Sequence, residues 1–483
     1  MALQWAGNLR KAIVGVSAIA MCACGDQGPR STGAARVTVA TAGLDVDPDG
    51  YGVRLDAGSP QNLSINGTLI FTGLSVGAHT VTLDGIASNC MMDQANPLSV
   101  DVLASDTADV FVAVRCTITY AAVSLGYLYA CGVTIRGAAY CWGYDAYGQL
   151  GDAGSGACNA CPSPVPVAGG LRFAVVNAGD RHACGLTTDG AAYCWGDNTL
   201  GKLGDGTTTS RASPEAVLGR LPLATLSTGG DHACGLLSDG SAYCWGGNYA
   251  GQLGDGTTTS RTSPIPVVGA LPLVHVSAGL EHTCGIAAGG AAYCWGSNFF
   301  GTLGDGTTTD RSSPVLVLGG LTFIQISAGS GHTCGLTAGG TAYCWGRNDF
   351  GELGDGTVTH RSSPVAVLGG LSFTALYAGG GTTCGITAGG AAYCWGWNSL
   401  GQLGDGTQAD HSTPVAVLGG LSFATVSVGD GGYHACGVTT AGVAYCWGDN
   451  SQGELGYGSF HIGSGYPEPP TYSTVPVKVV GQP

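Results

Sequence analysis

Between residues 119 and 483, short runs of alternating apolar and polar residues recur in groups of four. Such alternation, bounded by glycine, proline and Asp-Gly breaks, is typical of half-buried β-strands. In the copy around Cys234, the expected strands are 223–230 (LATLSTGG), 232–238 (HACGLLS), 241–247 (SAYCWGG) and 264–270 (PIPVVGA). We therefore predict four short antiparallel strands per copy. The second and third are joined by a three-residue turn at Asp239-Gly240, and a long loop precedes the fourth.

The copies return at a fixed interval, marked by the tetrapeptide YCWG. Its cysteines are Cys141, Cys194, Cys244, Cys294, Cys344, Cys394 and Cys446. Four of the six intervals are 50 residues (for example 294 − 244), and the others are 53 and 52. A period of this size indicates a repeat architecture, in which each unit buries its apolar face against its neighbours. Four strands repeated seven times predict an all-β fold, a seven-bladed β-propeller over residues 119–483.

Residues 36–118 follow a different pattern. Six alternating runs, from ARVTVATA at Ala35 to ADVFVAVRC ending at Cys116, predict a small β-sandwich ahead of the propeller. The stretch GLSVGAHTVTL is similar to a strand-turn-strand motif of small prealbumin-like bacterial surface domains. A spacer role is expected for this module, with ligand binding as the alternative.

The N-terminus has the features of an export signal. Arg10 and Lys11 precede the apolar run AIVGVSAIAMCA, which is too short to span a bilayer. The sequence around Cys24 resembles a bacterial lipoprotein signal, with Met21 departing from the usual leucine. We expect a signal peptide over 1–24, acylation of Cys24 and a flexible tether over 25–35. Cleavage without acylation, or an ordinary cytoplasmic N-terminus, are the alternatives.

Fourteen of the 20 cysteines form seven pairs with nine residues between the partners. In an exported protein this regularity predicts disulfides across adjacent strands, whereas two thiolates per repeat do not make a zinc site. The predicted bonds within the repeats are Cys131–Cys141, Cys184–Cys194, Cys234–Cys244, Cys284–Cys294, Cys334–Cys344, Cys384–Cys394 and Cys436–Cys446. Two further bonds are predicted, Cys90–Cys116 in the N-terminal module and Cys158–Cys161 in the loop of the first copy.

Composition narrows the range of partners. Glycine accounts for 86 of 483 residues and falls at fixed repeat positions, so it indicates many tight turns rather than disorder. The net charge is −15 and only 10% of residues are charged. Nucleic-acid binding requires clustered Lys and Arg, so we expect no nucleic-acid partner.

The stretch GDHACGLLSDGSAYCWGGNYAGQLGDG resembles the regulator of chromosome condensation repeat, and the likeness covers all seven copies. The resemblance implies a seven-bladed propeller, in which the histidine before the first cysteine bonds neighbouring loops. That position is occupied by His182, His232, His282, His332 and His434, and by Tyr129 and Thr382. The guanine-nucleotide exchange of the family's nuclear founder is not expected of an exported protein. The paired cysteines depart from the intracellular members.

Two further expectations concern acidic turns and ring closure. A carboxylate recurs at Asp152, in a Gly-Asp-Ala turn, and in Gly-Asp-Gly turns at Asp205, Asp255, Asp305, Asp355 and Asp405. Aspartate and glycine suit a tight turn, and one carboxylate per blade is too few for calcium, so we expect a structural role and no metal. The terminal strand Val475–Val480 aligns with the fourth strand of other copies. We expect it to complete the blade that begins near Tyr120 and so to close the ring.

No linear catalytic motif occurs in a supporting context, so recognition is the expected function. The residues after each Trp-Gly vary between copies and include types enriched in binding hot spots. The candidate binding residues are Tyr144, Tyr249, Phe299, Arg347 and Trp397. We expect a monomeric, non-enzymatic scaffold without cofactors that binds a protein or glycan. It would be an outer-membrane or cell-surface lipoprotein, attached to the membrane only by its lipid, or a secreted protein. The alternative is an extracellular lyase or hydrolase with a site in the central channel.

Overall fold

The computed structural model describes residues 32–46, 48–154, 158–429, 431–461 and 470–482. Contacts divide the chain into two units. The first holds the described residues within Met1–Thr41, Asp47–Ala87 and Met91–Val114, and the second holds Ala42–Val46, Ser88–Cys90 and Arg115–Pro483. The expected signal peptide, Cys24 and most of the expected tether lie outside the described residues. No helix among the described residues is long and apolar enough to cross a membrane.

The N-terminal strands form two four-stranded sheets, in the orders β4-β1-β8-β6 and β3-β2-β5-β7. Their bounds are β1 (Gly33–Gly43), β2 (Tyr51–Leu55), β3 (Gln61–Leu63), β4 (Thr68–Leu74), β5 (Gly77–Asp84), β6 (Cys90–Met92), β7 (Leu98–Val102) and β8 (Thr107–Cys116). Alternate residues such as Val37 and Val112 in the first sheet, and Val53 and Val81 in the second, are buried. Each sheet therefore covers an apolar face, as period-two alternation predicts.

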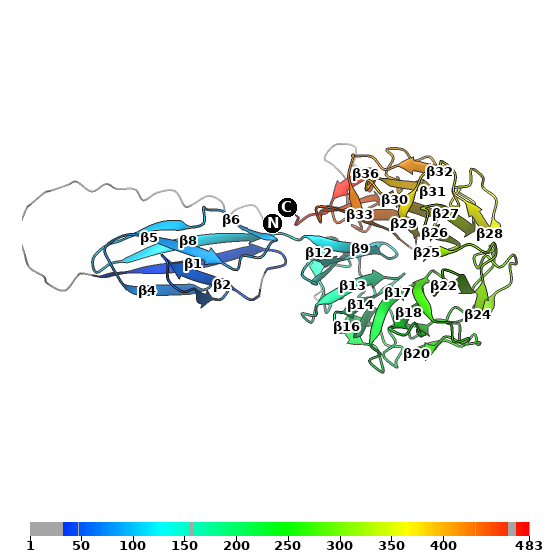
Figure 1. Cartoon of the computed structure of the whole chain (residues 1–483), viewed down its shortest axis with the longest axis horizontal. Helices are drawn as coiled ribbons and strands as arrows, with labels where there is room; N and C mark the ends of the chain where they lie inside the picture. Colours follow the sequence, from blue (N-terminus) through cyan, green and yellow to red (C-terminus); the bar gives the residue numbers. More distant parts are fainter. Residues whose placement is uncertain (1–31, 47, 155–157, 430, 462–469, 483) are drawn as a thin grey trace, which may run out of the picture. The chain divides into compact units, whose positions relative to one another are not determined.

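The remaining strands form seven four-stranded sheets in the described part of the chain, each from four consecutive strands. We number them blades I to VII; Figure 1 shows them following one another around a ring. Blade I comprises β9 (Tyr120–Leu125), β10 (Tyr129–Thr134), β11 (Ala139–Tyr144) and β12 (Ala160–Pro166). Blade II comprises β13 (Phe173–Ala178), β14 (His182–Thr187), β15 (Ala192–Gly196) and β16 (Arg211–Ala216). Blade III comprises β17 (Leu223–Thr228), β18 (His232–Leu237), β19 (Ala242–Gly246) and β20 (Arg261–Pro266).

The remaining four blades repeat the same plan. Blade IV comprises β21 (Leu273–Ala278), β22 (His282–Ala287), β23 (Ala292–Gly296) and β24 (Arg311–Leu316). Blade V comprises β25 (Phe323–Ala328), β26 (His332–Thr337), β27 (Ala342–Gly346) and β28 (Arg361–Ala366). Blade VI comprises β29 (Phe373–Ala378), β30 (Thr382–Thr387), β31 (Ala392–Gly396) and β32 (His411–Ala416). Blade VII comprises β33 (Phe423–Val428), β34 (His434–Thr439), β35 (Ala444–Asp449) and β36 (Tyr472–Lys478).

The hairpin between the second and third strands fixes the cysteine pairing. In blade III, Leu237 N donates to Ser241 O at 2.9 Å, and Gly240 takes the left-handed conformation (φ 86°) that closes a three-residue turn. This register places Cys234 directly opposite Cys244, with 4.1 Å between their Cα atoms. The same pairing occurs in the other six blades. All nine predicted disulfides are present.

The fourth strand begins earlier than predicted. In blade III it runs from Arg261, which lies opposite Gly246, and an irregularity between Cys244 and Gly246 shifts the register. Pro264 therefore lies inside the strand rather than at its start. A proline is tolerated there because the fourth strand is the outer edge of its sheet, where its missing N–H is not needed.

The expected scheme of ring closure is wrong. The last strand, β36, pairs with β35 of its own copy, with Val477 opposite Cys446, and does not join the sheet that begins at Tyr120. A fourth strand that returns from its own loop meets the free edge of the third strand first. Blades VII and I are joined instead by hydrogen bonds of the backbone, such as Tyr120 N to Gly442 O at 2.9 Å and Gly458 N to Pro162 O at 2.7 Å, and of side chains. Leu125 N donates to Ser427 Oγ at 3.2 Å, and Trp142 Nε1 donates to Glu454 O at 2.7 Å.

The apolar core is distributed between neighbouring blades. The cluster between blades II and III contains the buried disulfide Cys184–Cys194 together with Leu203, Leu223 and Trp245. The indole of Trp245 is fully buried, and its Nε1 donates to Lys202 O of the preceding blade at 3.1 Å. Each blade thus supplies its tryptophan to the core of its neighbour, which is the burial that a repeat unit needs from the next copy.

Candidate functional site

All five candidate binding residues belong to one face of the propeller. Antiparallel strands alternate in direction, so the loop between strands one and two and the loop between strands three and four emerge at the same end of each blade. We call this end the loop face. Tyr144 ends β11, and Tyr249, Phe299, Arg347 and Trp397 lie in the loops after the third strands. The turns around Asp239-Gly240 lie on the opposite face.

Ring contacts extend over the loop face from blade IV to blade I in two groups, Phe299 with Phe300 and then Phe350 with Trp397, Tyr433 and Tyr127. Phe299 and Phe300 lie 4.8 Å apart between ring centroids, Phe350 and Trp397 5.7 Å, Trp397 and Tyr433 5.3 Å, and Tyr433 and Tyr127 5.7 Å. These separations fall in the range of favourable aromatic pairs. We call these six residues, together with Arg347, the aromatic arc.

Arg347 joins the two halves of the aromatic arc. Its guanidinium carbon lies 5.5 Å from the ring centroid of Phe300 and 5.6 Å from that of Phe350, within cation–π range of both. Its Nε is 2.6 Å from Asp349 Oδ2 and 4.0 Å from Glu352 Oε1. Glu352 is completely buried, and burial raises the pKa of its carboxyl group. The positive charge of Arg347 is therefore balanced locally.

The five candidates fall into two groups. Phe299, Arg347 and Trp397 belong to the aromatic arc. The hydroxyl of Tyr249 donates at 2.9 Å to Glu281, which lines a cavity together with Phe299 and Arg347. Tyr144 lies apart from the arc and contacts Tyr147, with ring centroids 6.3 Å apart.

Sequence reasoning missed Phe300, Phe350, Tyr127, Tyr433 and Glu281. The two phenylalanines come one residue after the second variable position, and the other three lie just before or near the repeated histidine position. A search for aromatic residues beside the second variable position would have found the two phenylalanines, and a search for aromatic and charged residues just before the repeated histidine position would have found the other three.

A cavity of about 270 Å³ opens on the loop face between blades IV and V. Its lining includes Glu281, Ser297, Phe299, Phe300 and Arg347. Phe299 is 76% exposed, so a large apolar ring stands at the mouth beside a carboxylate. Burial and then the neighbouring Glu281, Asp231 and Asp180 carboxylates raise the pKa of Tyr249 well above its usual range.

Three of the recurring histidines bond the next blade, through a threonine of its second strand rather than through a loop. His232 Nε2 is 2.8 Å from Thr283 Oγ1 of the next blade, and the pairs His282–Thr333 and His332–Thr383 have the same distance. These side chains are at most 1% exposed, and burial lowers their pKa values to about 4 for His232 and about 3 for His282. They are neutral at physiological pH and do not face solvent.

The Gly-Asp-Gly carboxylates also serve the loops that carry them. In blade III, Asp255 accepts hydrogen bonds from Asn248 Nδ2 at 3.1 Å and from Thr257 N at 2.9 Å, and pairs with Arg261 NH2 at 2.7 Å. Asn248 is fully buried and its amide also donates to Thr257 O and Thr259 O. The carboxylate therefore fixes the long loop from within. Among the described residues, no group of three or more His, Cys, Asp or Glu side chains could hold a metal ion.

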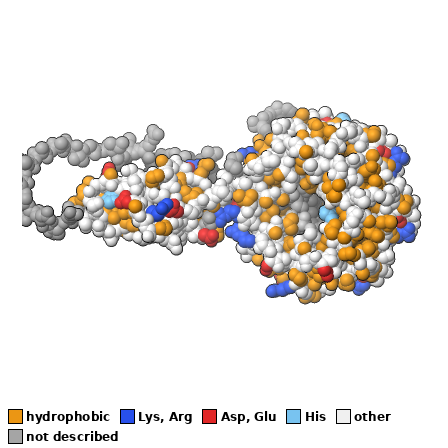
Figure 2. Space-filling view, in the orientation of Figure 1, with side chains coloured by type: hydrophobic (Ala, Val, Ile, Leu, Met, Phe, Trp, Pro, Cys, Tyr) orange, Lys and Arg blue, Asp and Glu red, His pale blue; other side chains and the backbone are white. Residues whose placement is uncertain are grey.

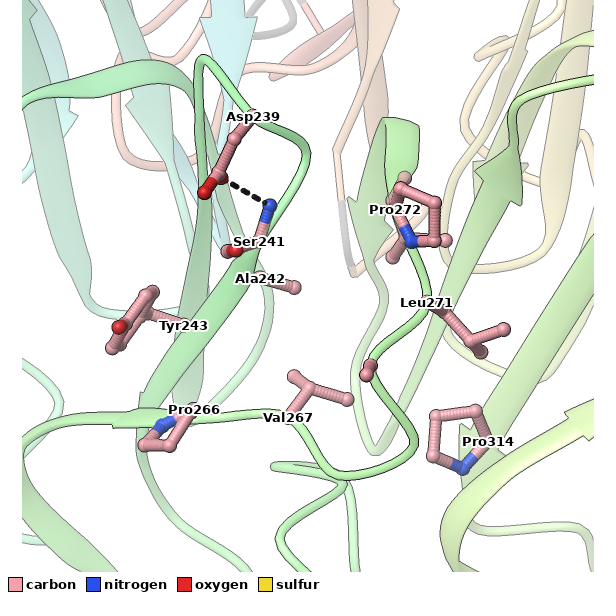
Figure 3. A pocket seen from close by; sticks show the side chains of 11 residues that line it. Asp239, Ser241, Ala242, Tyr243, Pro266, Val267, Leu271, Pro272 and Pro314 are labelled. Atoms are coloured by element: carbon pink, nitrogen blue, oxygen red, sulfur yellow. Dashed lines mark hydrogen bonds between the residues drawn. The ribbon is translucent and has the colours of Figure 1, made fainter.

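A second cavity, of about 320 Å³, lies on the opposite face between blades III and IV (Figure 3). Pro266, Leu271, Pro272 and Pro314 supply much of its lining. Asp239 is the only carboxylate in its lining, and that carboxylate accepts a hydrogen bond from the Ser241 N–H at 2.9 Å.

Figure 2 shows hydrophobic side chains spread across the visible propeller face, with charged ones mainly towards its rim.

The chain matches the model of the RCC1-like domain over residues 93–435, and that of the regulator of chromosome condensation (RCC1) repeat over 424–454. No curated protein sequence matches it. Similar solved structures include human WBSCR16, which is 21% identical with a TM-score of 0.59, covering 65% of this chain and 85% of that one. Prp20p from Saccharomyces cerevisiae is 20% identical with a TM-score of 0.61, covering 72% and 87%. Yeast RCC1 (Prp20) bound to Kap60 is 18% identical with a TM-score of 0.62, covering 75% and 85%. At these identities the structural likeness shows the fold alone.

Proposed function

The chain belongs to the RCC1-like family of propellers, and on this premise we propose that it is an exported, non-enzymatic scaffold that binds a protein or glycan on its loop face. The observation that carries the proposal is the aromatic arc. Six rings and one guanidinium lie in an unbroken series of contacts across blades IV, V, VI, VII and I. Aromatic and arginine side chains are the types that dominate binding hot spots.

Two further observations support a binding role. Solved structures with this fold include proteins that bind other proteins. Prp20p from yeast binds Gsp1p and histones, and yeast RCC1 (Prp20) also forms a complex with Kap60. In addition, the ring scaffold repeats closely from blade to blade, while the residues on the loop face differ. A rigid scaffold with variable loops is the usual arrangement for presenting a recognition surface.

The proposed location follows from the disulfides. Nine bonds link eighteen of the 20 cysteines, and such frameworks persist in oxidising compartments. We place the protein outside the cytoplasm, as a surface lipoprotein anchored through Cys24 or as a secreted monomer.

The test is a capture experiment from cell-envelope extract, in parallel with a glycan array. Immobilised wild-type protein is compared with a variant combining Tyr249→Ala, Phe299→Ala and Trp397→Ala. A control variant combines Val274→Ala and Ile324→Ala, two exposed side chains (62% and 59%) at the opposite end of their blades. Far-ultraviolet circular dichroism and thermal melting verify that both variants fold.

We expect a ligand that wild type and the control retain and that the loop-face variant binds at least about tenfold more weakly. A ligand retained equally by all three proteins would rule out the loop face. Turnover of a glycan or peptide library by the pure protein would overturn the non-enzymatic proposal.

A further inference from the structure

The cavity between blades IV and V is lined by a carboxylate and by aromatic rings, two kinds of group that favour a positively charged ligand. We infer that it is the anchor site for a single basic side chain, Lys or Arg, of a partner protein. This inference rests on the proposed binding function and adds the chemical class of the ligand. Its volume of about 270 Å³ lies just below the roughly 300–1,000 Å³ of small-molecule sites, so it suits one side chain better than a whole cofactor.

The carboxylate of Glu281 supplies the charge that a basic side chain needs. It lines the cavity and accepts one hydrogen bond, from the Tyr249 hydroxyl at 2.9 Å. A carboxylate accepts several hydrogen bonds, so this contact orients Glu281 while leaving capacity for a ligand donor. The other charge in the lining, Arg347, is held against Asp349 at 2.6 Å. Glu281 is thus the dominant charge presented to an incoming group.

The aromatic rings of the lining suit a cation better than a sugar. Phe299 and Phe300 are nearly perpendicular, with an interplanar angle of 88°, and Phe300 meets His360 at 78°. Neighbouring rings at such angles do not form a flat platform for stacking a sugar ring. A guanidinium or ammonium group requires only one ring face within about 6 Å.

The molecule already uses this contact with its own side chains. Arg347 lies over Phe300 and Phe350. Between loops of blades I and II, the guanidinium carbon of Arg181 lies 5.0 Å from the ring centroid of Tyr147. The exposed ring of Phe299 can provide the same contact to a ligand. The net charge of −15 also attracts a basic partner over long range.

The test is a titration of the full protein with a blocked pentapeptide, monitored by ligand-observed NMR. The peptide has a central arginine with two glycines on each side. Matched peptides replace the arginine with lysine, with citrulline, which keeps the shape without the charge, or with leucine. The protein variants are Glu281→Gln, Phe299→Ala and, as a control of equal charge change, Glu215→Gln. Glu215 is an exposed residue of β16 on an outer strand.

We expect the arginine and lysine peptides to bind at least about fivefold more tightly than the citrulline and leucine peptides, and this preference to shrink with added salt. Glu281→Gln should abolish the preference, Phe299→Ala should weaken binding of all four peptides, and Glu215→Gln should change neither. Phe299 is 76% exposed, so its variant remains informative if Glu281→Gln destabilises the fold.

Equal binding of the arginine and citrulline peptides, or equal behaviour of the two glutamate variants, would overturn the inference. So would a neutral chitotriose probe that displaces the arginine peptide, because it would make the cavity a glycan site. The capture experiment separates the two proposals. If Glu281→Gln keeps a partner that the triple loop-face variant loses, the scaffold function stands and the basic anchor fails. If the triple variant keeps every partner, the scaffold function fails.

Discussion

The hydrogen bonds between histidine and threonine of adjacent blades give a quantitative test of how the ring is held. Thr333 Oγ1 donates to Thr302 O at 2.9 Å, so its oxygen accepts the Nε2–H of His282 at 2.8 Å. Thr333→Val keeps the shape of the side chain and removes the hydroxyl. Thr302 O retains the Trp345 Nε1 donor at 2.8 Å, whereas the buried His282 ring loses its acceptor.

The expected cost is that of one buried donor left unsatisfied, about 1–3 kcal/mol. If Arg115–Pro483 unfolds as one unit, at about 2 cal/mol/K per residue its unfolding entropy is about 0.8 kcal/mol/K. Dividing the cost by this entropy predicts a Tm lower by about 1–4 °C. Thr333→Ser keeps the hydroxyl and should lose less than Thr333→Val.

The chain also offers the reverse experiment. His182 is fully buried and neither of its ring nitrogens has a hydrogen-bond partner in the structure, because the next blade carries Ala233 where blades IV, V and VI carry threonine. Ala233→Thr should supply the missing acceptor, contributing about 0.5–1.5 kcal/mol and raising Tm by about 1–2 °C.

Differential scanning calorimetry at neutral pH under non-reducing conditions measures these shifts. The control is Thr308→Ala, in an exposed loop position of blade IV, which should leave Tm unchanged. The reasoning is refuted if Thr333→Val has the same Tm as wild type, or if Ala233→Thr lowers Tm while Thr333→Ser does not. Either result would mean that the interblade hydrogen bonds do not limit the stability of the ring.

Three further predictions concern cysteines and buried titratable groups. Because all 18 cysteines of the described residues are disulfide-bonded, denatured, unreduced protein lacking residues 1–31 should show no thiol in an Ellman assay, and several free thiols per chain would contradict the framework. Burial lowers the pKa of His232 to about 4 and of His332 to about 3, so below about pH 6.5 the unfolded state binds more protons than the folded state. Tm should therefore fall as pH decreases from 6.5 towards 4. A Tm that stays constant over that window would contradict the lowered pKa values of these histidines. Glu454 has the opposite sign: burial raises its pKa from 4.5 to about 8, so its folded state holds the proton longer and its contribution to stability is lost as pH rises from 4.5 to 8. Glu454→Gln introduces the residue that stands at the equivalent positions of other blades, Gln252 and Gln402. It should raise Tm by at least about 2 °C at pH 8 and by much less at pH 5. An equal change in Tm at both pH values would refute the raised pKa of Glu454.

The sequence determined the local features, because they depend on spacing along one strand or across one hairpin. Period-two alternation identified the strands, and nine residues between Cys234 and Cys244 with an Asp-Gly turn allowed one register, which places the two sulfurs together. The seven copies of YCWG predicted repeated four-stranded sheets. The same local rule missed the start of the fourth strand at Arg261, since proline at position 264 looked like a boundary and only the sheet edge made it tolerable.

The tertiary structure decided everything that depends on contacts between copies. Closure of the ring through Ser427 and Glu454, rather than by exchange of β36, depends on which strand edge the chain meets first. The pairing of His282 with Thr333 joins residues 51 apart, and no pattern within one repeat specifies it. The aromatic arc likewise combines loops from five blades. Sequence variability indicated Phe299, Arg347 and Trp397 one by one, but their contacts through Phe300 and Phe350 exist only because the ring brings successive copies side by side.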